Sequence, residues 1–360
     1  MADVLVNIIL FIPLGAALGS AGIGGWRAVG FGAALSGAVE FAQLFIPGRD
    51  SSLGDVCTNT AGAFLGWALA RWAAGVLRSP RRPPAWSGGA AAGLALAVIL
   101  ATGLLLHGAF PATAYFSMWT PDLGHLEFYR GRVLRASFDS VALPPEELSP
   151  SARARELLAR GATLRVRALA GPHPAGLAPL FSIYDDRQQE ILLLGPDRHD
   201  LVFRYRTRAA SHRLDAPDIR LARAMDAVRP GDTLDIEVRR VGNGYCVRLN
   251  ASTTCGLGFS AGNGWALLEY PPSLPRWLKG LLNVGWVAGL WLPAGFYGAS
   301  RWGSLAVVVV AVVALAIVAP AAGLVATPLG QWAGTATGIL AGAGSREAII
   351  RHGRSRRIKQ

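Results

Sequence analysis

The sequence has few charged residues. Lys, Arg, Asp and Glu make up 16% of its 360 residues, while 52% are hydrophobic; a soluble globular protein carries about 25% charged residues. The shortage is uneven, because residues 112–272 hold 20 of the 35 basic and 18 of the 23 acidic side chains. Low charge elsewhere excludes an ordinary soluble fold and predicts a membrane protein with a near-neutral, water-soluble insert.

Signatures of nucleic-acid binding and of common catalytic sites are also missing. The formal net charge of +12 comes mostly from residues outside 112–272, and no basic stripe with interleaved aromatics accompanies it, which excludes nucleic acid as a partner. The sequence contains no phosphate-binding glycine loop, no nucleophile elbow and no zinc signature. Its six histidines lack the spacing of metal ligands. These absences favour a protein that binds over one that catalyses.

Long apolar stretches dominate the rest of the chain. Seven of them approach the ~20 residues that a membrane-spanning helix needs. Small residues four apart, Gly62 with Gly66 and Gly338 with Gly342, are typical of closely packed membrane helices. The sequence therefore predicts a bundle of about seven transmembrane helices. Their expected ranges are 4–24, 29–46, 56–77, 89–108, 279–299, 303–326 and 329–345.

The distribution of basic residues predicts an orientation. Lys and Arg accumulate at the cytoplasmic ends of membrane helices, and here they follow the third and seventh helices and occupy two short connections. We therefore expect a multi-pass protein of the plasma (inner) membrane, with the N-terminus and residues 112–272 outside and the C-terminus in the cytoplasm. The cytoplasmic basic residues are Arg27, Arg71, Arg78, Arg81, Arg82, Arg301, Arg346, Arg351, Arg354, Arg356, Arg357 and Lys359.

The outer insert has the pattern of an all-β domain. Short segments alternate apolar and polar residues between Gly, Pro and Asp clusters, as in strands with one buried face. Eight or more antiparallel strands in this length favour a two-sheet sandwich or jelly roll. The strands are expected at 133–138, 163–169, 180–184, 191–194, 201–206, 233–239, 245–250 and 265–268.

These patterns divide the chain into domains. The expected order is three membrane helices in 1–78, a basic and proline-rich cytoplasmic loop at 79–88, a fourth helix at 89–108, the extracytoplasmic sandwich at 112–272, three further helices in 279–345 and a basic cytoplasmic tail at 346–360.

Two of the three cysteines are close in sequence. Cys246 and Cys255 are nine residues apart, on either side of an Asn-Ala-Ser-Thr turn. A hairpin would bring them together, and outside the cytoplasm a disulfide is expected. A zinc site is the alternative, but no nearby pair of histidines supports it.

Polar residues of the first three helices gather at the predicted outer boundary of the membrane. Such groups cost roughly 2.5–3.5 kcal/mol each inside a bilayer, so they usually mark a functional site. Two interpretations remain open: Glu40, Arg49 and Asp55 form ion pairs that hold the helices together, or the residues bind a ligand or lipid headgroup. The candidate ligand-binding residues are Asp3, Asn7, Glu40, Gln43, Arg49, Asp50, Asp55 and Asn59.

The order of these residues resembles the VanZ-like family. The motifs are D-x-x-x-N-x-x-x-F-x-P-x-G from Asp3, E-x-x-Q from Glu40, R-D at Arg49 and D-x-x-x-N-T-x-G-x-x-x-G from Asp55, and they cover residues 3–75. The family is named for an accessory protein of glycopeptide-antibiotic resistance associated with teicoplanin. The resemblance implies a membrane protein of the cell envelope.

Residues 112–272 resemble, more loosely, the concanavalin A-like or laminin-G-like jelly roll. The residues that carry this likeness are Phe138-Asp139, Pro179–Asp185, Asp200–Phe203 and Gly242–Asn250. Such domains often bind glycans, sometimes through calcium, which implies a carbohydrate-binding module. Candidate calcium ligands are the loop acids Asp139, Asp185 and Asp186, and the alternative is that they are solvated turn residues.

Three functions follow from these patterns. The leading hypothesis is recognition of an envelope glycan, a lipid-linked precursor or a glycopeptide antibiotic at the outer membrane face. A second is an enzyme acting on a lipid-linked substrate, with Glu40 and Asp55 as acid–base groups. A third is an adhesion or partner-binding protein in which the polar residues are purely structural. No cofactor is expected apart from the calcium ion considered above.

Overall fold

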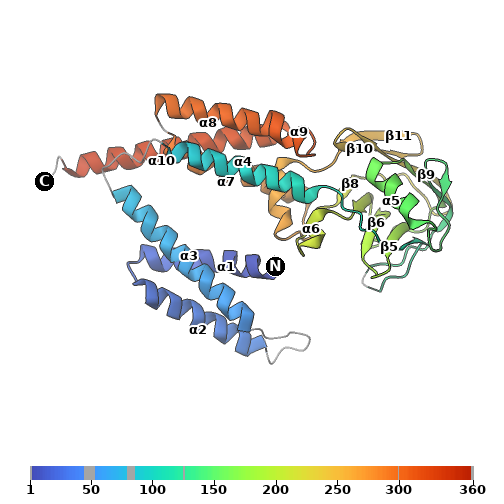
Figure 1. Cartoon of the computed structure of the whole chain (residues 1–360), viewed down its shortest axis with the longest axis horizontal. Coiled ribbons are helices and arrows are strands. Elements are labelled where there is room, and N and C mark those ends of the chain that lie inside the picture. Colours follow the sequence, from blue (N-terminus) through green and yellow to red (C-terminus); the bar gives the residue numbers. More distant parts are fainter. Residues whose placement is uncertain (1, 44–52, 79–85, 125, 299, 358–360) are drawn as a thin grey trace.

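A computed structural model describes residues 2–43, 53–78, 86–124, 126–298 and 300–357. A two-sheet domain lies at one end, and two groups of helices extend away from it (Figure 1). The first group contains α1 (Ala2–Ser20), α2 (Gly25–Gln43) and α3 (Leu53–Arg78). The second contains α4 (Ser87–Leu106), α7 (Arg276–Tyr297), α8 (Arg301–Val313), η2 (Ala314–Val318), α9 (Ala319–Ala321) and α10 (Leu329–Arg357).

Each of the seven predicted apolar segments is helical, but the spanning criterion is met by fewer of them. Among the described residues, the helices at Ser87–Leu106 and Trp302–Ala321 are long and apolar enough to cross a membrane, and Leu10–Ser20 is a shorter apolar helix. Within the described residues, the prediction of seven such spans is therefore corrected to two. In α2 and α7 the physical reason is composition, because glycines, amides and charged residues dilute their apolar runs. The last helix also runs through the predicted basic tail to Arg357.

Glycines set the helix contacts in both groups. A Cβ atom on Gly62 or Gly66 of α3 would overlap the backbone of α1 at Ile8 and Ile12. Gly338 and Gly342 of α10 meet the backbone of α7 in the same way. Only glycine permits backbones to approach so closely, so both predicted pairs of small residues are found at helix–helix interfaces.

The two-sheet domain is an antiparallel sandwich. Its sheets have the strand orders β1-β5-β6-β7-β8 and β11-β10-β9-β4-β2-β3. Alternate residues of β4 and β9 are buried between the sheets, whereas β5 and β6 are buried along nearly their whole length. Phe138, Val166, Ile183 and Ile236 belong to one core. The strands are β1 (Tyr115–Trp119), β2 (Arg132–Phe138), β3 (Val141–Ala142), β4 (Leu164–Leu169), β5 (Phe181–Asp185), β6 (Glu190–Asp197), β7 (Asp200–Tyr205), β8 (Ile219–Leu221), β9 (Thr233–Val241), β10 (Gly244–Leu249) and β11 (Ser252–Leu257).

Most of the predicted strands are present, and one is wrong. The segment 265–268 belongs to a 3-10 helix, η1 (Ala261–Leu267). Ser260 and Asn263 form a reciprocal cap at its start, which turns the chain into a helix instead of a strand. The alternation in the sequence did not indicate the helices α5 (Ser151–Arg160) and α6 (Arg208–Ser211) between the strands.

The predicted disulfide is confirmed. Cys246 of β10 and Cys255 of β11 are bonded across the hairpin that these two strands form. The bond lies near the edge of the six-stranded sheet, because β11 is its outermost strand.

Candidate functional site

Polar residues from the first three helices meet at one end of the group. Ser36 and Glu40 lie one turn apart on α2, and Asp55 and Asn59 lie one turn apart on α3. Because α2 ends and α3 begins at the same side, Glu40 and Asp55 lie toward the same end. Asn7, near the start of α1, completes what we call the polar cluster: Asn7, Ser36, Glu40, Asp55 and Asn59.

Hydrogen bonds join the three helices within the polar cluster. The side-chain amide of Asn7 donates to Oδ1 of Asp55 at 2.8 Å. The amide of Asn59 donates to the hydroxyl of Ser36, also at 2.8 Å. Each contact links residues far apart in sequence, so the cluster is a product of the helix packing that Gly62 and Gly66 permit.

The cluster contains a buried acceptor without a hydrogen bond. Asn59 is 7% exposed, and its Oδ1 atom has no partner within the described structure. Glu40, in the same cluster, is 8% exposed. Buried polar atoms are nearly always paired, and one left unpaired costs about 1–3 kcal/mol. The unpaired oxygen of Asn59 therefore marks a place where a hydrogen-bond donor that the described residues do not supply would be stabilised.

The structure describes some of the other predicted residues and leaves others outside its described part. Gln43 is the last residue of α2 and is partly exposed. Asp3 lies in the first turn of α1, but its side chain is outside the described part. Arg49 and Asp50 lie outside the described residues altogether. Ser36 is a cluster member that sequence reasoning missed, although its spacing of four residues from Glu40 was a usable signal.

The polar cluster faces the same side of the molecule as the sandwich. The start of α1 lies toward the sandwich, whereas α10 ends at the opposite pole (Figure 1). The orientation of these two ends relative to a membrane stays a prediction.

The sandwich is attached to the second helix group by specific polar contacts. Asn243, in the turn after β9, donates to the carbonyl oxygens of Pro320 at 2.6 Å and Leu324 at 2.9 Å. Gln331 of α10 is 3% exposed and bonds both the backbone amide of Gly262, at 2.9 Å, and the hydroxyl of Ser260, at 2.6 Å. Gln331 thus has a structural role in holding η1 against the helices.

A charged network extends this attachment. Asp200 at the start of β7 accepts a hydrogen bond from Arg276, the first residue of α7. Arg220 of β8 pairs with Asp197 at 2.6 Å and with Asp218 at 2.8 Å. Burial alone would lower the pKa of the Arg220 guanidinium, but Asp218 and Asp197 outweigh it and raise the pKa above its usual range. These charges are paired, so the network holds the junction together.

The carboxylates of the candidate calcium ligands Asp139 and Asp185 already accept hydrogen bonds from backbone amides. Asp139 accepts from the backbone amide of Thr163 at 3.0 Å and lies 3.4 Å from Arg160. Asp185 is 4% exposed and accepts from the backbone amides of Arg187 and Gln189, and Asp186 is exposed. Asp139 and Asp185 belong to different sheets. Within the described part of the chain, no group of three or more His, Cys, Asp or Glu side chains could hold a metal ion.

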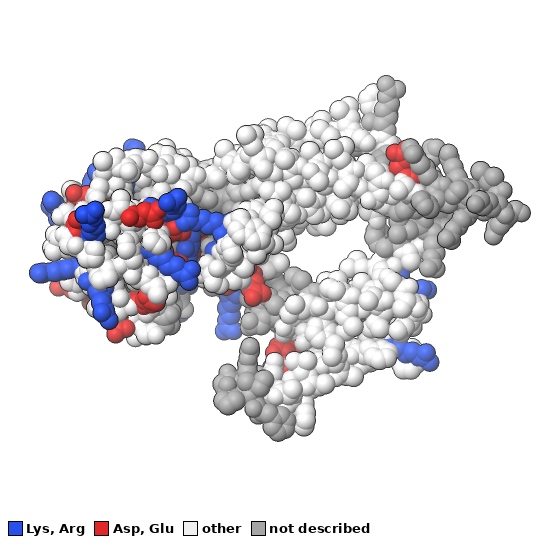
Figure 2. All heavy atoms as spheres, turned by 180° about the vertical axis from the view of Figure 1, so that it is seen from behind, with Lys and Arg blue, Asp and Glu red and all other residues white. Residues whose placement is uncertain are grey.

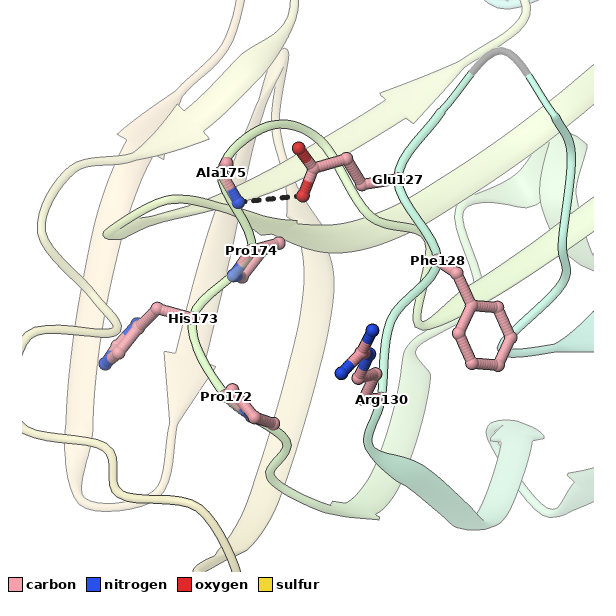
Figure 3. A pocket seen from close by; sticks show the side chains of 7 residues that line it. All are labelled: Glu127, Phe128, Arg130, Pro172, His173, Pro174 and Ala175. Atoms are coloured by element: carbon pink, nitrogen blue, oxygen red, sulfur yellow. Dashed lines mark hydrogen bonds between the residues drawn. The ribbon is translucent and has the colours of Figure 1, made fainter.

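A hollow of about 400 Å³ lies between two loops of the sandwich. Figure 3 shows the guanidinium of Arg130 between the segment that carries Phe128 and the segment that carries Pro172 and His173. The carboxylate of Glu127 is already bonded to the backbone amide of Ala175 at 2.7 Å. This hydrogen bond joins the two loops that form the hollow, and Arg130 is the permanently charged basic residue in its lining.

Comparison with known proteins identifies the first part of the chain. Residues 2–74 match the family model described as VanZ/LLP1. No curated protein and no solved structure gives a significant match. The matched segment comprises α1, α2 and most of α3, and therefore every member of the polar cluster. Over this segment, about a fifth of its length, the chain is similar to the VanZ/LLP1 family, as the motifs of the sequence predicted.

Proposed function

We propose that the chain is an envelope membrane protein of the VanZ type that recognises a lipid-linked or glycan component at the outer membrane face. The polar cluster binds the polar part of this ligand, and the sandwich acts as a carbohydrate-binding module. The observation that carries the proposal is the buried Oδ1 of Asn59, which has no partner among the described residues and whose side chain bonds Ser36, one turn from the buried Glu40.

Membrane placement is supported by the surface of the helices. The helices at Ser87–Leu106 and Trp302–Ala321 have the length and apolarity of membrane spans. The helix bodies are almost free of Lys, Arg, Asp and Glu on the face seen in Figure 2, whereas the sandwich carries many. Many large apolar side chains are exposed on the helices, including Phe31, Phe64 and Leu305. Lipid tails would cover this surface, and the basic end of α10 would face the cytoplasm.

The chemistry of the cluster favours a ligand that donates hydrogen bonds. The Asn59 oxygen accepts from a hydroxyl or an ammonium group, and sugars and lipid headgroups supply both. The side-chain amide of Asn7 orients the Asp55 carboxylate, which lies one helical turn before Asn59 on α3. Arg49 precedes Asp55 by six residues in the sequence, and we propose it as the partner of a phosphate or carboxylate on the same ligand.

The test is the identity of the lipids that co-purify with the full chain, measured by native mass spectrometry. We expect the wild-type protein to retain a polar, glycan-bearing or lipid-linked molecule, and Asn59→Leu to lose it. Thr58→Val is the matched control, because the Thr58 hydroxyl donates to the Asp55 carbonyl oxygen within α3 at 3.2 Å. Retention by Asn59→Leu, or loss by Thr58→Val as well, would show that Asn59 does not bind the ligand.

The alternatives make different predictions in the same preparations. If the polar cluster were acid–base machinery, the purified protein would turn over a lipid-linked substrate and Glu40→Gln would abolish turnover. If the cluster were only structural and the sandwich served adhesion, deletion of 112–272 would remove all activity while Asn59→Leu removed none. A glycopeptide antibiotic as ligand would be seen as binding that requires Asn59.

A further inference from the structure

Four arginines line the outer face of the six-stranded sheet. Their strand register places Arg135 of β2 opposite Arg167 of β4, and places Arg165 of β4 and Arg248 of β10 on either side of Glu237 of β9. Together with their neighbours they enclose a hollow of about 500 Å³. We call this surface the arginine face: Arg135, Arg165, Arg167 and Arg248.

Two acids hold three of these arginines in place. Glu237 lies 3.2 Å from Arg165 and 2.9 Å from Arg248, and Asp235 lies 3.5 Å from Arg167. The hydrogen bond from Arg248 lowers the pKa of the Glu237 carboxyl, and Arg165 adds to this effect, so the carboxylate stays ionised. Glu237 therefore orients the guanidinium groups of Arg165 and Arg248 at neutral pH.

The pairing leaves the arginine face short of negative charge. Arg160 also lies at its edge, paired with Asp139, so five basic side chains meet three acidic ones and leave a net charge of +2. The side chains of Arg165, Arg167 and Arg248 remain 51%, 60% and 43% exposed. Arg135 has no ion pair among the described residues. Each guanidinium has five donors. Arg165 uses them on Glu237 and the Asp139 carbonyl, and Arg248 on Glu237 and the Asn250 carbonyl, which leaves further donors for a ligand.

The spacing of the charges favours a polymer over a single ion. Arg165 and Arg248 lie on strands that flank β9, and their side chains converge on the same carboxylate oxygen of Glu237. Arg165 and Arg167 are two residues apart on one strand, or about 7 Å. One carboxylate or phosphate reaches at most two of these positions. A chain with repeated negative charges reaches all of them.

The arginine face also lies away from the helices. The turn after β9 contacts Pro320 and Leu324 through Asn243, whereas Glu237 and Asp235 precede Val241 by four and six residues. At about 3.3 Å per residue, this is roughly 13–20 Å along the strand. The face would therefore contact polymers outside the membrane in which the helices lie.

We infer that the arginine face binds an acidic polysaccharide, one that carries repeated carboxylate or phosphate groups. This inference rests on the proposed role of the sandwich as a carbohydrate-binding module and names the class of glycan. Charge complementarity supplies the attraction, bidentate guanidinium–anion pairs supply the geometry, and the two acids keep the site oriented before the ligand arrives.

The experiment measures binding of fluorescein-labelled polygalacturonate to the full chain in neutral detergent. We expect saturable binding that weakens when sodium chloride is raised from about 0.05 M to about 0.5 M, because exposed charges are screened. Arg135→Gln/Arg248→Gln should weaken binding roughly tenfold or more, through the loss of two charge-assisted contacts. The control Arg153→Gln/Arg223→Gln removes two exposed, ion-paired arginines elsewhere on the sandwich and should bind as the wild type does.

Three outcomes would overturn the inference. Equal binding by the two double variants would show that charge alone, without this face, suffices. Binding to neutral dextran in place of polygalacturonate would preserve a carbohydrate-binding sandwich but reject an acidic ligand. Binding to vesicles of phosphatidylglycerol, with no binding to the polymer, would identify an anionic lipid surface as the ligand. None of these outcomes depends on Asn59, so the proposed function of the polar cluster is tested separately.

Discussion

At the scale of single residues, the polar cluster contains a buried oxygen atom that has no hydrogen bond among the described residues. A purely structural contact is expected to pair its buried atoms, as Trp67 does when its indole N–H donates to the carbonyl oxygen of Ile23 at 2.8 Å. Asn59 keeps an unpaired oxygen in the same helix group. The two contacts differ in this respect, and the unpaired oxygen is the observation on which the proposed ligand binding rests.

The first prediction compares these two contacts by stability. Ser36→Ala/Asn59→Leu removes both partners of one hydrogen bond together with the unpaired oxygen, so we expect unchanged stability or a gain of about 1–2 kcal/mol in the ligand-free protein. Trp67→Phe removes a satisfied bond and should cost about 1 kcal/mol. Thermal unfolding in detergent measures both variants. Equal destabilisation of the two would show that the Asn59 oxygen is paired in the free protein.

A second residue-scale prediction concerns pH and Glu237. Its folded-state pKa is lowered from the ordinary value of 4.5, first by the hydrogen bond from Arg248. Its contribution to stability is therefore present above pH 4.5 and is lost as the pH falls through the lower, folded-state pKa. The difference in melting temperature between wild type and Glu237→Gln should shrink between about pH 5 and pH 3. A difference independent of pH would contradict this account.

At the scale of elements, α1 and α3 are held together by glycine contacts. Gly66 touches the backbone of α1 near Ile12, whereas a Cβ atom on Gly37 of α2 would meet nothing within 4 Å. The two glycines therefore serve different purposes, although both lie inside helices of similar composition.

The third prediction uses this matched pair. Gly66→Ala forces the helices apart and should destabilise the protein by about 1–3 kcal/mol. Gly37→Ala introduces no clash and should stabilise α2 by about 0.5–1 kcal/mol, because alanine loses less backbone freedom on folding. Thermal unfolding measures both, and similar effects would mean that α1 and α3 are not in close contact.

At the scale of the whole molecule, the sandwich is fixed to the second helix group at several points. Asn243 bonds the chain just after α9, Gln331 bonds η1, and Arg276 joins α7 to Asp200 of β7. Breaking any of these contacts would leave polar groups unpaired, so the contacts hold the sandwich and the second helix group together.

The fourth prediction tests this attachment. Asn243→Ala should raise amide hydrogen exchange across residues 319–325, because two carbonyl oxygens there lose the hydrogen bond from the Asn243 amide. Exchange in the core strands β4 and β9 should not change. Ser252→Ala, at an exposed position of β11, is the control. Unchanged exchange in residues 319–325 would show that Asn243 does not hold the junction.

Local sequence patterns predicted the helices, the strands and the disulfide, because each depends on residues that are close along the chain. Seven apolar segments became helices, alternating segments became strands, and Cys246 and Cys255 paired across a hairpin. Residues 265–268 were the exception, because the cap formed by Ser260 and Asn263 outweighed their apolar pattern. The order of the motifs was also enough to assign Glu40, Asp55 and Asn59 to one predicted site.

Only the tertiary structure decided which of these groups touch. In the folded chain, Ser36 accepts a hydrogen bond from Asn59, and Gln331 donates one to Ser260 at the start of η1. Four arginines from three strands lie on one face of a sheet. The reason is physical: helix and strand periodicities report which face of an element is buried, but not what covers it. Partners 23 to 83 residues apart, such as Ser36 with Asn59 and Arg165 with Arg248, meet only when whole elements pack.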